Sequence, residues 1–156
     1  MAKYYQFMTT HQSDMKLLKP GVFCSSQEMT GDLESFLIML ENYCDSNKIS
    51  MARICFHRNN SSPLMAMLIV NTNCYTYPAH RHAHKFESYF IIKGKCIFKR
   101  FNDEGESISE IVLVEGSFLL NESYTYHSLE PLTPVLAFIE HTTGPFIGSS
   151  NEYLPR

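Results

Sequence analysis

The stretch of sequence that decides the fold reads Pro78-Ala79-His80-Arg81-His82-Ala83-His84-Lys85-Phe86-Glu87 and continues to Gly94. Side chains two positions apart on an extended chain point to the same side, so His80 and His82 share one face. Glu87 follows after a short turn and can return to that face. Two imidazole nitrogens and a carboxylate oxygen that converge on one point favour a divalent transition metal: Fe, Mn, Zn, Ni or Co.

Length and composition predict a single globular domain over residues 1–156, because the 156-residue chain is 44% hydrophobic and can bury a core. The net charge of -3 gives no electrostatic reason to expect nucleic acid. The longest apolar run, over residues 64–70, is too short to span a membrane. No basic and apolar leader is visible in the first residues. The five cysteines form no CxxC pair, which is typical of reduced thiols in a cytoplasmic protein.

The first 50 residues are expected to form an extension with one helix and one short strand. The strand is expected at residues 22–25. A stripe of apolar side chains marks the helix, and Thr30 or Ser26 can cap its start. The stripe consists of Leu33, Phe36, Leu37, Leu40 and Cys44. We expect this helix to brace the outside of the remaining fold, or to form part of a subunit contact.

From Met51 onward the apolar pattern has period two, which indicates strands. Short strands separated by turns are typical of a closed all-β architecture. The barrel is expected over about residues 51–146, and the tail from Gly144 is expected to be a loop. The expected strands are 51–57, 64–70, 87–92, 96–101, 108–114, 117–120, 127–129 and 134–141.

Two sequence motifs resemble those of the cupin superfamily. The first, G-x5-H-x-H-x3-4-E-x6-G, is matched at His80, His82, Glu87 and Gly94, with Cys74 at the place of its leading glycine. The second, G-x5-P-x-G-x2-H-x3-N, is matched at its first glycine and its histidine, whereas its proline, its second glycine and its asparagine are absent. Gly116 and His127 are the two matches. Glu122 replaces the proline, Tyr124 replaces the second glycine, and Glu130-Pro131 stands in the place of the asparagine.

This resemblance implies an all-β fold, the double-stranded β-helix or jelly-roll barrel of cupins, with the N-terminal helix packed outside. It also implies that His127 is the fourth ligand of one divalent metal, with His80, His82 and Glu87. Burying three imidazoles and a carboxylate without a cation would be costly, which supports a metal. His84 continues the alternation and is an alternative ligand, although a place at the cavity mouth or in solvent is favoured.

A wider pattern is similar to the WbuC family of cupin-fold metalloproteins. The resemblance runs from about Ala52 to Phe146, and it implies a role in O-antigen, lipopolysaccharide or capsule biosynthesis, because members of that family sit among such genes. The matching segments are Arg53-x3-His57, Pro78-x-His80-Arg81-His82, Lys85-x-Glu87, Phe101-Asn102-Asp103-x-Gly105 and Glu140-x3-Gly144-Pro145-Phe146.

Five further residues are candidates for binding or catalysis. Arg53 and His57 share a strand face, which is either a polar wall for an anionic or hydroxylated ligand or an exposed face; the resemblance favours the pocket. His57 and Glu140 are candidate general bases, and Glu140 is alternatively an ion-pair partner of Arg53. Tyr89 is expected to line the cavity or pack in the core. Tyr124 is expected to close the mouth of the cavity or to pack.

Three functions are compatible with these residues. The first is a metal-dependent isomerase or epimerase acting on a sugar or sugar nucleotide. The second is a non-catalytic module in which the metal fixes a sugar-like small molecule or effector. The third is oxygen-dependent dioxygenation with Fe(II). A homodimer is expected from the frequency of twofold symmetry, and neither nucleic acid nor membrane is an expected partner.

Overall fold

The computed structural model describes residues 15–25, 31–146 and 151–155, which form one helix and twelve strands. Within these residues most of the chain is β-structure, as the period-two pattern predicted. The elements are β1 (Met15–Lys19), β2 (Val22–Ser25), α2 (Leu33–Asn47), β3 (Met51–Cys55), β4 (Leu64–Thr72), β5 (His80–His82), β6 (Glu87–Lys93), β7 (Lys95–Phe101), β8 (Ser107–Val114), β9 (Phe118–Asn121), β10 (Tyr126–Pro131), β11 (Val135–Thr143) and β12 (Asn151–Tyr153).

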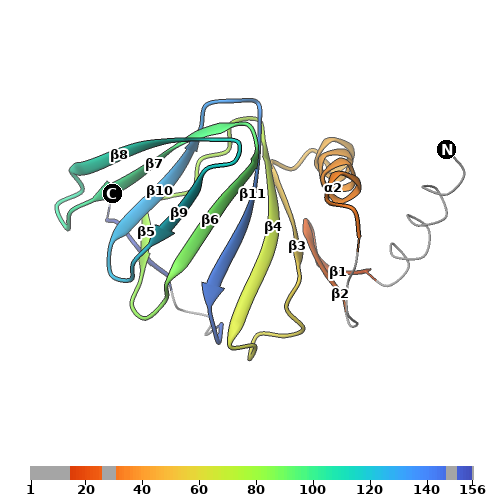
Figure 1. Ribbon diagram of the computed structural model, residues 1–156, viewed down its shortest axis with the longest axis horizontal. Helices are drawn as coiled ribbons and strands as arrows, with labels where there is room; N and C mark the ends of the chain where they lie inside the picture. The colour runs from red at the N-terminus through yellow and green to blue at the C-terminus, as the bar shows by residue number, and fades with distance from the viewer. Residues whose placement is uncertain (1–14, 26–30, 147–150, 156) are drawn as a thin grey trace, which may run out of the picture.

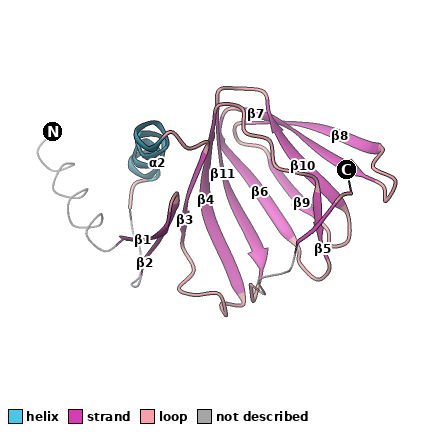
Figure 2. Cartoon of the chain, turned by 180° about the vertical axis from the view of Figure 1, so that it is seen from behind, coloured by secondary structure: helices cyan, strands magenta, loops and turns pink. Residues whose placement is uncertain are grey.

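The strands form two sheets that face each other (Figure 1). The larger sheet has the order β1-β2-β3-β4-β11-β6-β9, and the smaller has the order β12-β5-β10-β7-β8. Neighbouring strands are antiparallel except for β2 and β3, which pair in parallel. Figure 2 shows the same two layers from behind. From β4 onward consecutive strands lie in different sheets, except for β7 and β8, so residues distant in sequence meet between the sheets. The prediction of an all-β jelly roll is confirmed.

The apolar run at β4 is continuous because this strand is buried on both faces. Met67 and Ile69 point into the core between the two sheets, which also contains Phe98 and Phe138. Leu68 points to the opposite face of the large sheet, where a second core lies under the helix. A strand covered on both sides needs apolar side chains at every position, whereas a strand with one solvated face alternates.

Helix α2 covers the outer face of the large sheet, as the brace interpretation of its apolar stripe predicted (Figure 1). Leu40 and Cys44 are buried against Ala52 and Ile54 of β3. The carboxylate of Asp32 caps the helix by accepting a hydrogen bond from the backbone N–H of Ser35, at 3.1 Å. The caps suggested by sequence, Thr30 and Ser26, lie outside the described residues. The helix does not have the length that a membrane crossing requires.

The two ends of the chain contribute strands that periodicity did not predict. Strand β1 pairs with β2, in a region without a clear pattern. Strand β12 lies in the tail that was expected to be loop, and it pairs with β5 at the edge of the small sheet. Arg81 reinforces that pairing through an ion pair with Glu152, at 2.7 Å. Three residues are too few to show a period, so only the tertiary pairing reveals β12.

The turn between β6 and β7 depends on Gly94. Its φ of 87° lies in the left-handed region, which side chains other than hydrogen disfavour. A Cβ at this position would also meet the backbone carbonyl of Val135 and the hydroxyl of Thr133. The turn brings β7 into the small sheet and leaves β6 in the large one, so that the two strands face each other across the space between the sheets.

Candidate metal site and ligand cavity

Three histidines meet on the inner face of the small sheet. His80 on β5 lies directly opposite His127 on β10, in antiparallel register. His82 follows on β5 with the same orientation as His80, because side chains alternate along a strand. One nitrogen of each of the three rings lies within 4.8 Å of the others, and these three residues form a group that can hold a metal ion. His82 and His127 are buried, and His80 is half-buried.

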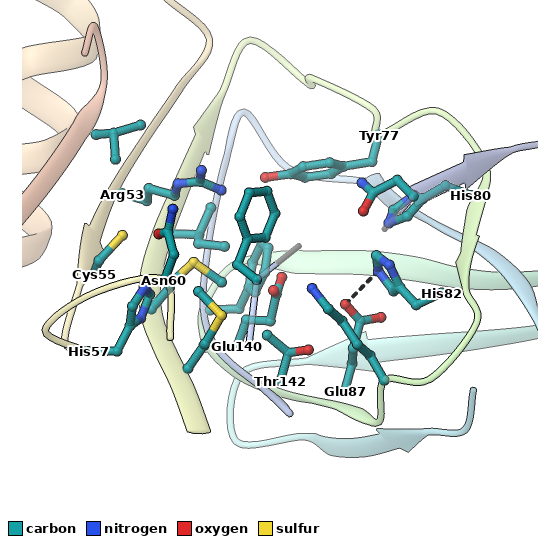
Figure 3. Close-up of a pocket in the computed structure, with 18 of the residues that line it drawn as sticks. Arg53, Cys55, His57, Asn60, Tyr77, His80, His82, Glu87, Glu140 and Thr142 are labelled. Carbon is teal, nitrogen blue, oxygen red and sulfur yellow. Dashed lines mark ion pairs between the residues drawn. The ribbon is translucent and has the colours of Figure 1, made fainter. Parts of the chain in front are cut away.

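Glu87 reaches two of these histidines from the opposite sheet. Its Oε1 lies 2.9 Å from Nε2 of His82 (Figure 3). Its Oε2 lies 3.0 Å from Nε2 of His127. Two ligands on adjacent corners of an octahedral ion, with bonds of about 2.1 Å, are about 3.0 Å apart. The carboxylate is therefore at a separation from the two ring nitrogens that a shared cation requires.

The backbone orients two of the rings so that Nε2 is available. Nδ1 of His80 lies 2.9 Å from the carbonyl oxygen of Pro78, and Nδ1 of His127 lies 2.9 Å from that of Thr125. In this arrangement each Nδ1–H donates to a carbonyl, and a neutral ring keeps its lone pair on Nε2. The Nε2 of His127 then faces a carboxylate oxygen. Two acceptors at that distance repel unless a proton or a cation lies between them. A proton on Nε2 gives a hydrogen bond to Glu87, and a divalent metal can take the place of that proton, so the donor set fits a metal.

The charge state of the site also suits a metal. Burial, together with the neighbouring His127 and His82, lowers the pKa of His80 to about 4, so this ring is neutral at pH 7. Burial raises the pKa of Glu87, but hydrogen bonds with His127 and His82 outweigh it and hold that pKa well below its usual range. A neutral imidazole beside an ionised carboxylate is a donor set for a borderline divalent cation.

Two buried residues support this cluster from behind. The hydroxyl of Tyr89 donates to Oε2 of Glu87 at 2.9 Å and lies 3.3 Å from Nε2 of His127. The side-chain amide of Asn121 lies 3.1 Å from Nδ1 of His127. Such contacts hold ligands in orientation and tune their basicity. From sequence, cavity lining and core packing are alternatives for Tyr89, and the structure shows both. The sequence offered no signal for Asn121, whose role depends on the pairing of β9 with β6.

A cavity of about 530 Å³ opens from the histidine cluster between the sheets (Figure 3). Its volume is within the range of small-molecule sites. Apolar side chains such as Met67 and Phe138 form part of its wall, and polar groups project from several strands. Of the candidate residues from sequence, those that line it are Arg53, His57, His80, His82, Glu87, Tyr89 and Glu140.

Arg53 and His57 face the cavity rather than solvent, as the resemblance favoured. Arg53 projects inward from β3 because the alternate residues, Ala52 and Ile54, face the helix. His57 lies just after β3, and its Nδ1 is 3.2 Å from the carbonyl oxygen of Ala66. Burial lowers the pKa of His57, so its ring is neutral near pH 7 and can accept a proton.

Glu140 projects into the same cavity from β11. Burial raises the pKa of its carboxyl to about 8, and the nearby charge of Glu87 adds to that effect. At neutral pH the Glu140 carboxyl therefore holds a proton, which it can donate. It can accept a proton from another group only after it has lost its own. The ion pair with Arg53 that sequence offered as an alternative is not among the ion pairs of the described residues.

The structure does not bring Tyr124 to this cavity. Its side chain is 57% exposed, and its hydroxyl lies 3.1 Å from Nδ1 of His84, which is also exposed and outside the three-histidine group. Tyr124 and Cys74 stand where the cupin motifs have glycines, and both keep a positive φ, of 67° and 53°. The backbone turns that those glycines normally allow are therefore retained despite the substitutions.

The cavity is also lined by residues that were not candidates from sequence. Lys85 is one of them: β5 ends at His82, so the alternation of side chains along that strand does not extend to Lys85. Thr142 lies on the same inward face of β11 as Glu140, because the two residues are two positions apart on one strand. Tyr77 also lines the cavity, and its hydroxyl lies 3.2 Å from the side-chain oxygen of Asn71.

Solved structures with the same arrangement of strands identify the fold. KdgF from Halomonas sp. matches with 19% identity and a TM-score of 0.51, over 64% of this chain and 82% of KdgF. A Klebsiella pneumoniae protein with a double-stranded β-helix domain matches with 12% identity and a TM-score of 0.54, over 69% of this chain and 86% of that protein. This chain has the cupin fold.

A longer cupin is also similar. The capsular polysaccharide assembling protein CapF from Staphylococcus aureus matches with 14% identity and a TM-score of 0.60, over 69% of this chain. This chain spans only 32% of CapF. A family model described as a domain of unknown function (DUF6016) matches residues 46–113, which include His80, His82 and Glu87 but end before His127. No curated protein matches the chain in sequence.

Proposed function

We propose that this cupin is a metal-dependent enzyme that moves a proton on a sugar or sugar nucleotide, as an isomerase or epimerase in surface-polysaccharide biosynthesis. One observation carries the proposal. A single cavity borders a cluster fit for a divalent metal, through His80 and His82, and is lined by two groups suited to proton transfer, His57 and Glu140. The resemblance to the WbuC family and the likeness in fold to a capsular polysaccharide assembling protein support the choice of substrate class.

His80, His82, His127 and Glu87 would hold the metal. Bound there, a divalent ion supplies a Lewis acid that polarises a carbonyl or hydroxyl oxygen. Tyr89 keeps the carboxylate of Glu87 in place, and the apolar walls at Met67 and Phe138 limit the access of water. A metal held by these residues would lower the pKa of a neighbouring C–H or O–H group of the ligand.

The proton would then pass between the sugar and the two titratable side chains. His57 is neutral at pH 7 and accepts a proton from the ligand, whereas Glu140 holds one and returns it. Because the two come from different strands, they can serve different positions or faces of the sugar. An epimerisation that exchanges a proton between opposite faces of a carbon atom uses one group to remove the proton and another to add one.

Hydrogen exchange with solvent tests this proposal directly. The protein, loaded in turn with Fe, Mn, Zn, Ni or Co, is incubated in D₂O with hexose 6-phosphates and nucleoside diphosphate sugars, and ¹H NMR follows deuterium entering carbon-bound positions. We expect exchange with at least one metal, its loss with a chelator, and its loss in Glu140→Gln or His57→Gln. His141→Gln serves as the control, because this exposed histidine lies outside the cavity lining. Metal-loaded protein that catalyses no exchange on any of these sugars would reject the enzyme.

A second function has one specific observation in its favour. This chain corresponds to about a third of CapF, so the likeness covers a module of a longer protein. Binding of a sugar without deuterium exchange in the same experiment would select a non-catalytic, metal-dependent sugar-binding module.

A further inference from the structure

Arg53 is a cation in the cavity that has no ion-pair partner among the residues that the structure describes. Its Nε is buried and makes no hydrogen bond. Among the described residues it forms no ion pair, whereas Arg81 at the surface pairs with both Asp103 and Glu152. Burying a charge without a partner is unfavourable, and a buried guanidinium normally has carboxylate or phosphate oxygens on its donor fork.

The charges around the cavity differ from those of the chain as a whole. The chain has a net charge of -3, yet the described residues that line the cavity include more bases than acids. The basic residues are Lys19, Arg53, Arg58 and Lys85, and the acidic residues are Glu87 and Glu140. The carboxylate of Glu87 is occupied by two imidazoles. An excess of positive over negative charge along a cavity wall attracts anionic ligands.

We propose that Arg53 binds the anionic group of the ligand, a carboxylate or a phosphate, at the side of the cavity that lies across from the histidine cluster. This inference rests on the proposed function, since it concerns the same cavity, and it names the substrate class: a sugar acid or a sugar phosphate rather than a neutral sugar. The planar fork of Arg53 can hold two oxygens of either group, and it would gain its missing hydrogen bonds in doing so.

The placement of the side chains agrees with a ligand that has two recognised ends. Figure 3 shows Arg53 and Asn60 on one side of the pocket, His80 and His82 on the other, and Glu140 between them. With the anion at Arg53, hydroxyl or carbonyl oxygens of the same molecule reach toward the histidines. The carbon atoms between the two ends then lie beside Glu140, where the proposed proton transfer takes place.

Lys85 supplies a second cation at the cavity wall. It stacks over the ring of Phe146, with Nζ 5.0 Å from the ring centroid. Burial lowers its pKa, which reflects limited solvation of its ammonium group. Lys85 adds to the positive charge of the cavity wall, and a phosphate with two negative charges would gain more from it than a carboxylate with one. Comparing a phosphate with a carboxylate therefore shows which of these two anionic groups the cavity binds better.

Isothermal titration calorimetry with three matched probes tests the inference: glucose, glucuronate and glucose 1-phosphate, each at millimolar concentrations. The full chain is used in metal-loaded form. We expect at least one of the two anionic probes to bind the wild type about tenfold or more tighter than glucose does, since hydrogen bonds to charged groups are worth about that much. Tighter binding of glucuronate than of glucose 1-phosphate would identify the carboxylate, and the reverse order the phosphate.

Two arginine variants distinguish a specific contact from general electrostatics. Arg53→Met should weaken binding of the preferred anionic probe by about tenfold or more. The variant should then bind that probe and glucose with nearly equal affinity. Arg58→Met removes the same charge from an exposed position at the cavity rim and should weaken binding by about twofold. Arg53→Lys keeps a positive charge without the planar fork, so we expect an intermediate affinity.

Three results would overturn the inference: no binding by either anionic probe, equal affinity for charged and neutral probes, or the same affinity in Arg53→Met as in the wild type. If Arg53→Met does not fold, the wild-type probe series and Arg53→Lys still decide. Metal content is measured on every variant. If the wild type holds no metal but still prefers the anionic probes, the proposed enzyme is rejected and the role of Arg53 is retained. If the wild type holds its metal but shows no preference for the anionic probes, only the role of Arg53 is rejected.

Discussion

Glu87 and His127 lie on strands of different sheets, and Oε2 of the first is 3.0 Å from Nε2 of the second. This contact joins the two layers at the inner end of the cavity. Both side chains are almost fully buried, with 5% and 1% of their surfaces exposed. A cation shared between them would therefore fix the spacing of the sheets as well as provide the reactive centre.

Removing either of two histidines should remove the metal. We expect His80→Ala and His127→Ala to lower the metal content from about one ion per chain to a trace, because each leaves too few ligands to complete the site. Elemental analysis of the purified variants provides the measurement. His141→Ala is the matched control, because this histidine is exposed and lies outside the three-histidine group. Unchanged metal in both His80→Ala and His127→Ala would show that the site lies elsewhere.

The hydroxyl of Tyr89 should tune metal affinity without being a ligand. Tyr89→Phe removes the hydrogen bond to Glu87 and keeps the packing of the ring. We expect metal affinity to fall about 10- to 100-fold, measured by competition with a chelator of known affinity. Tyr124→Phe removes an exposed hydroxyl that contacts His84, and it should leave the affinity unchanged. Equal affinities in all three proteins would contradict a supporting role for Tyr89.

The packing of α2 should contribute to stability independently of the site. Leu40 is fully buried between the helix and the large sheet, so Leu40→Ala should lower the free energy of unfolding by about 2–5 kcal/mol in urea titrations. Ile38 lies on the same helix but is 49% exposed, and Ile38→Ala should change stability by less than about 1 kcal/mol. Metal content should stay the same in both variants. A similar loss in both would indicate that α2 does not pack as described.

The raised pKa of Glu140 should make stability depend on pH. Its carboxyl keeps a proton up to about pH 8 in the folded protein, but loses it near pH 4.5 when unfolded. The folded state therefore binds more protons between these values, and stability should fall as pH rises through this window. Glu140→Gln cannot titrate, so its stability relative to the wild type should increase from pH 5 to pH 8.

Urea titrations of metal-free protein across this range measure the effect. Glu122→Gln is the control for the loss of one carboxylate, since Glu122 is exposed. Parallel pH profiles for Glu140→Gln and the wild type would contradict a buried, protonated carboxyl at this position.

Much of the fold followed from local patterns. Period two from Met51 onward predicted strands because a strand has two faces, and a stripe at helical spacing predicted a helix whose one face is buried. The helix packs outside the large sheet as expected. The continuous apolar run at β4 indicated burial, but only the structure shows the helix on one side and the barrel core on the other.

Alternation along a strand predicted only the part of the candidate site whose residues are neighbours on one strand, and the resemblance to the cupin motifs supplied the other two ligands. His80 and His82 share a face because they are two apart, and the spacing of the cupin motifs pointed to Glu87 and His127. Asn121 and the inward turn of Lys85 had no such signal. Their positions depend on where β5 ends and on how β9 pairs, which no short window of sequence contains.

The sequence by itself determined the class of fold and the pair of histidines on β5, because alternation along a strand is a local property of the backbone. Tertiary structure decided that Glu87 faces His127 across two sheets, that Arg53 lies unpaired inside a cavity, and that Tyr124 lies outside it. Those relations arise from closure of the sheets and from pairing between distant strands, and such contacts depend on the whole chain at once.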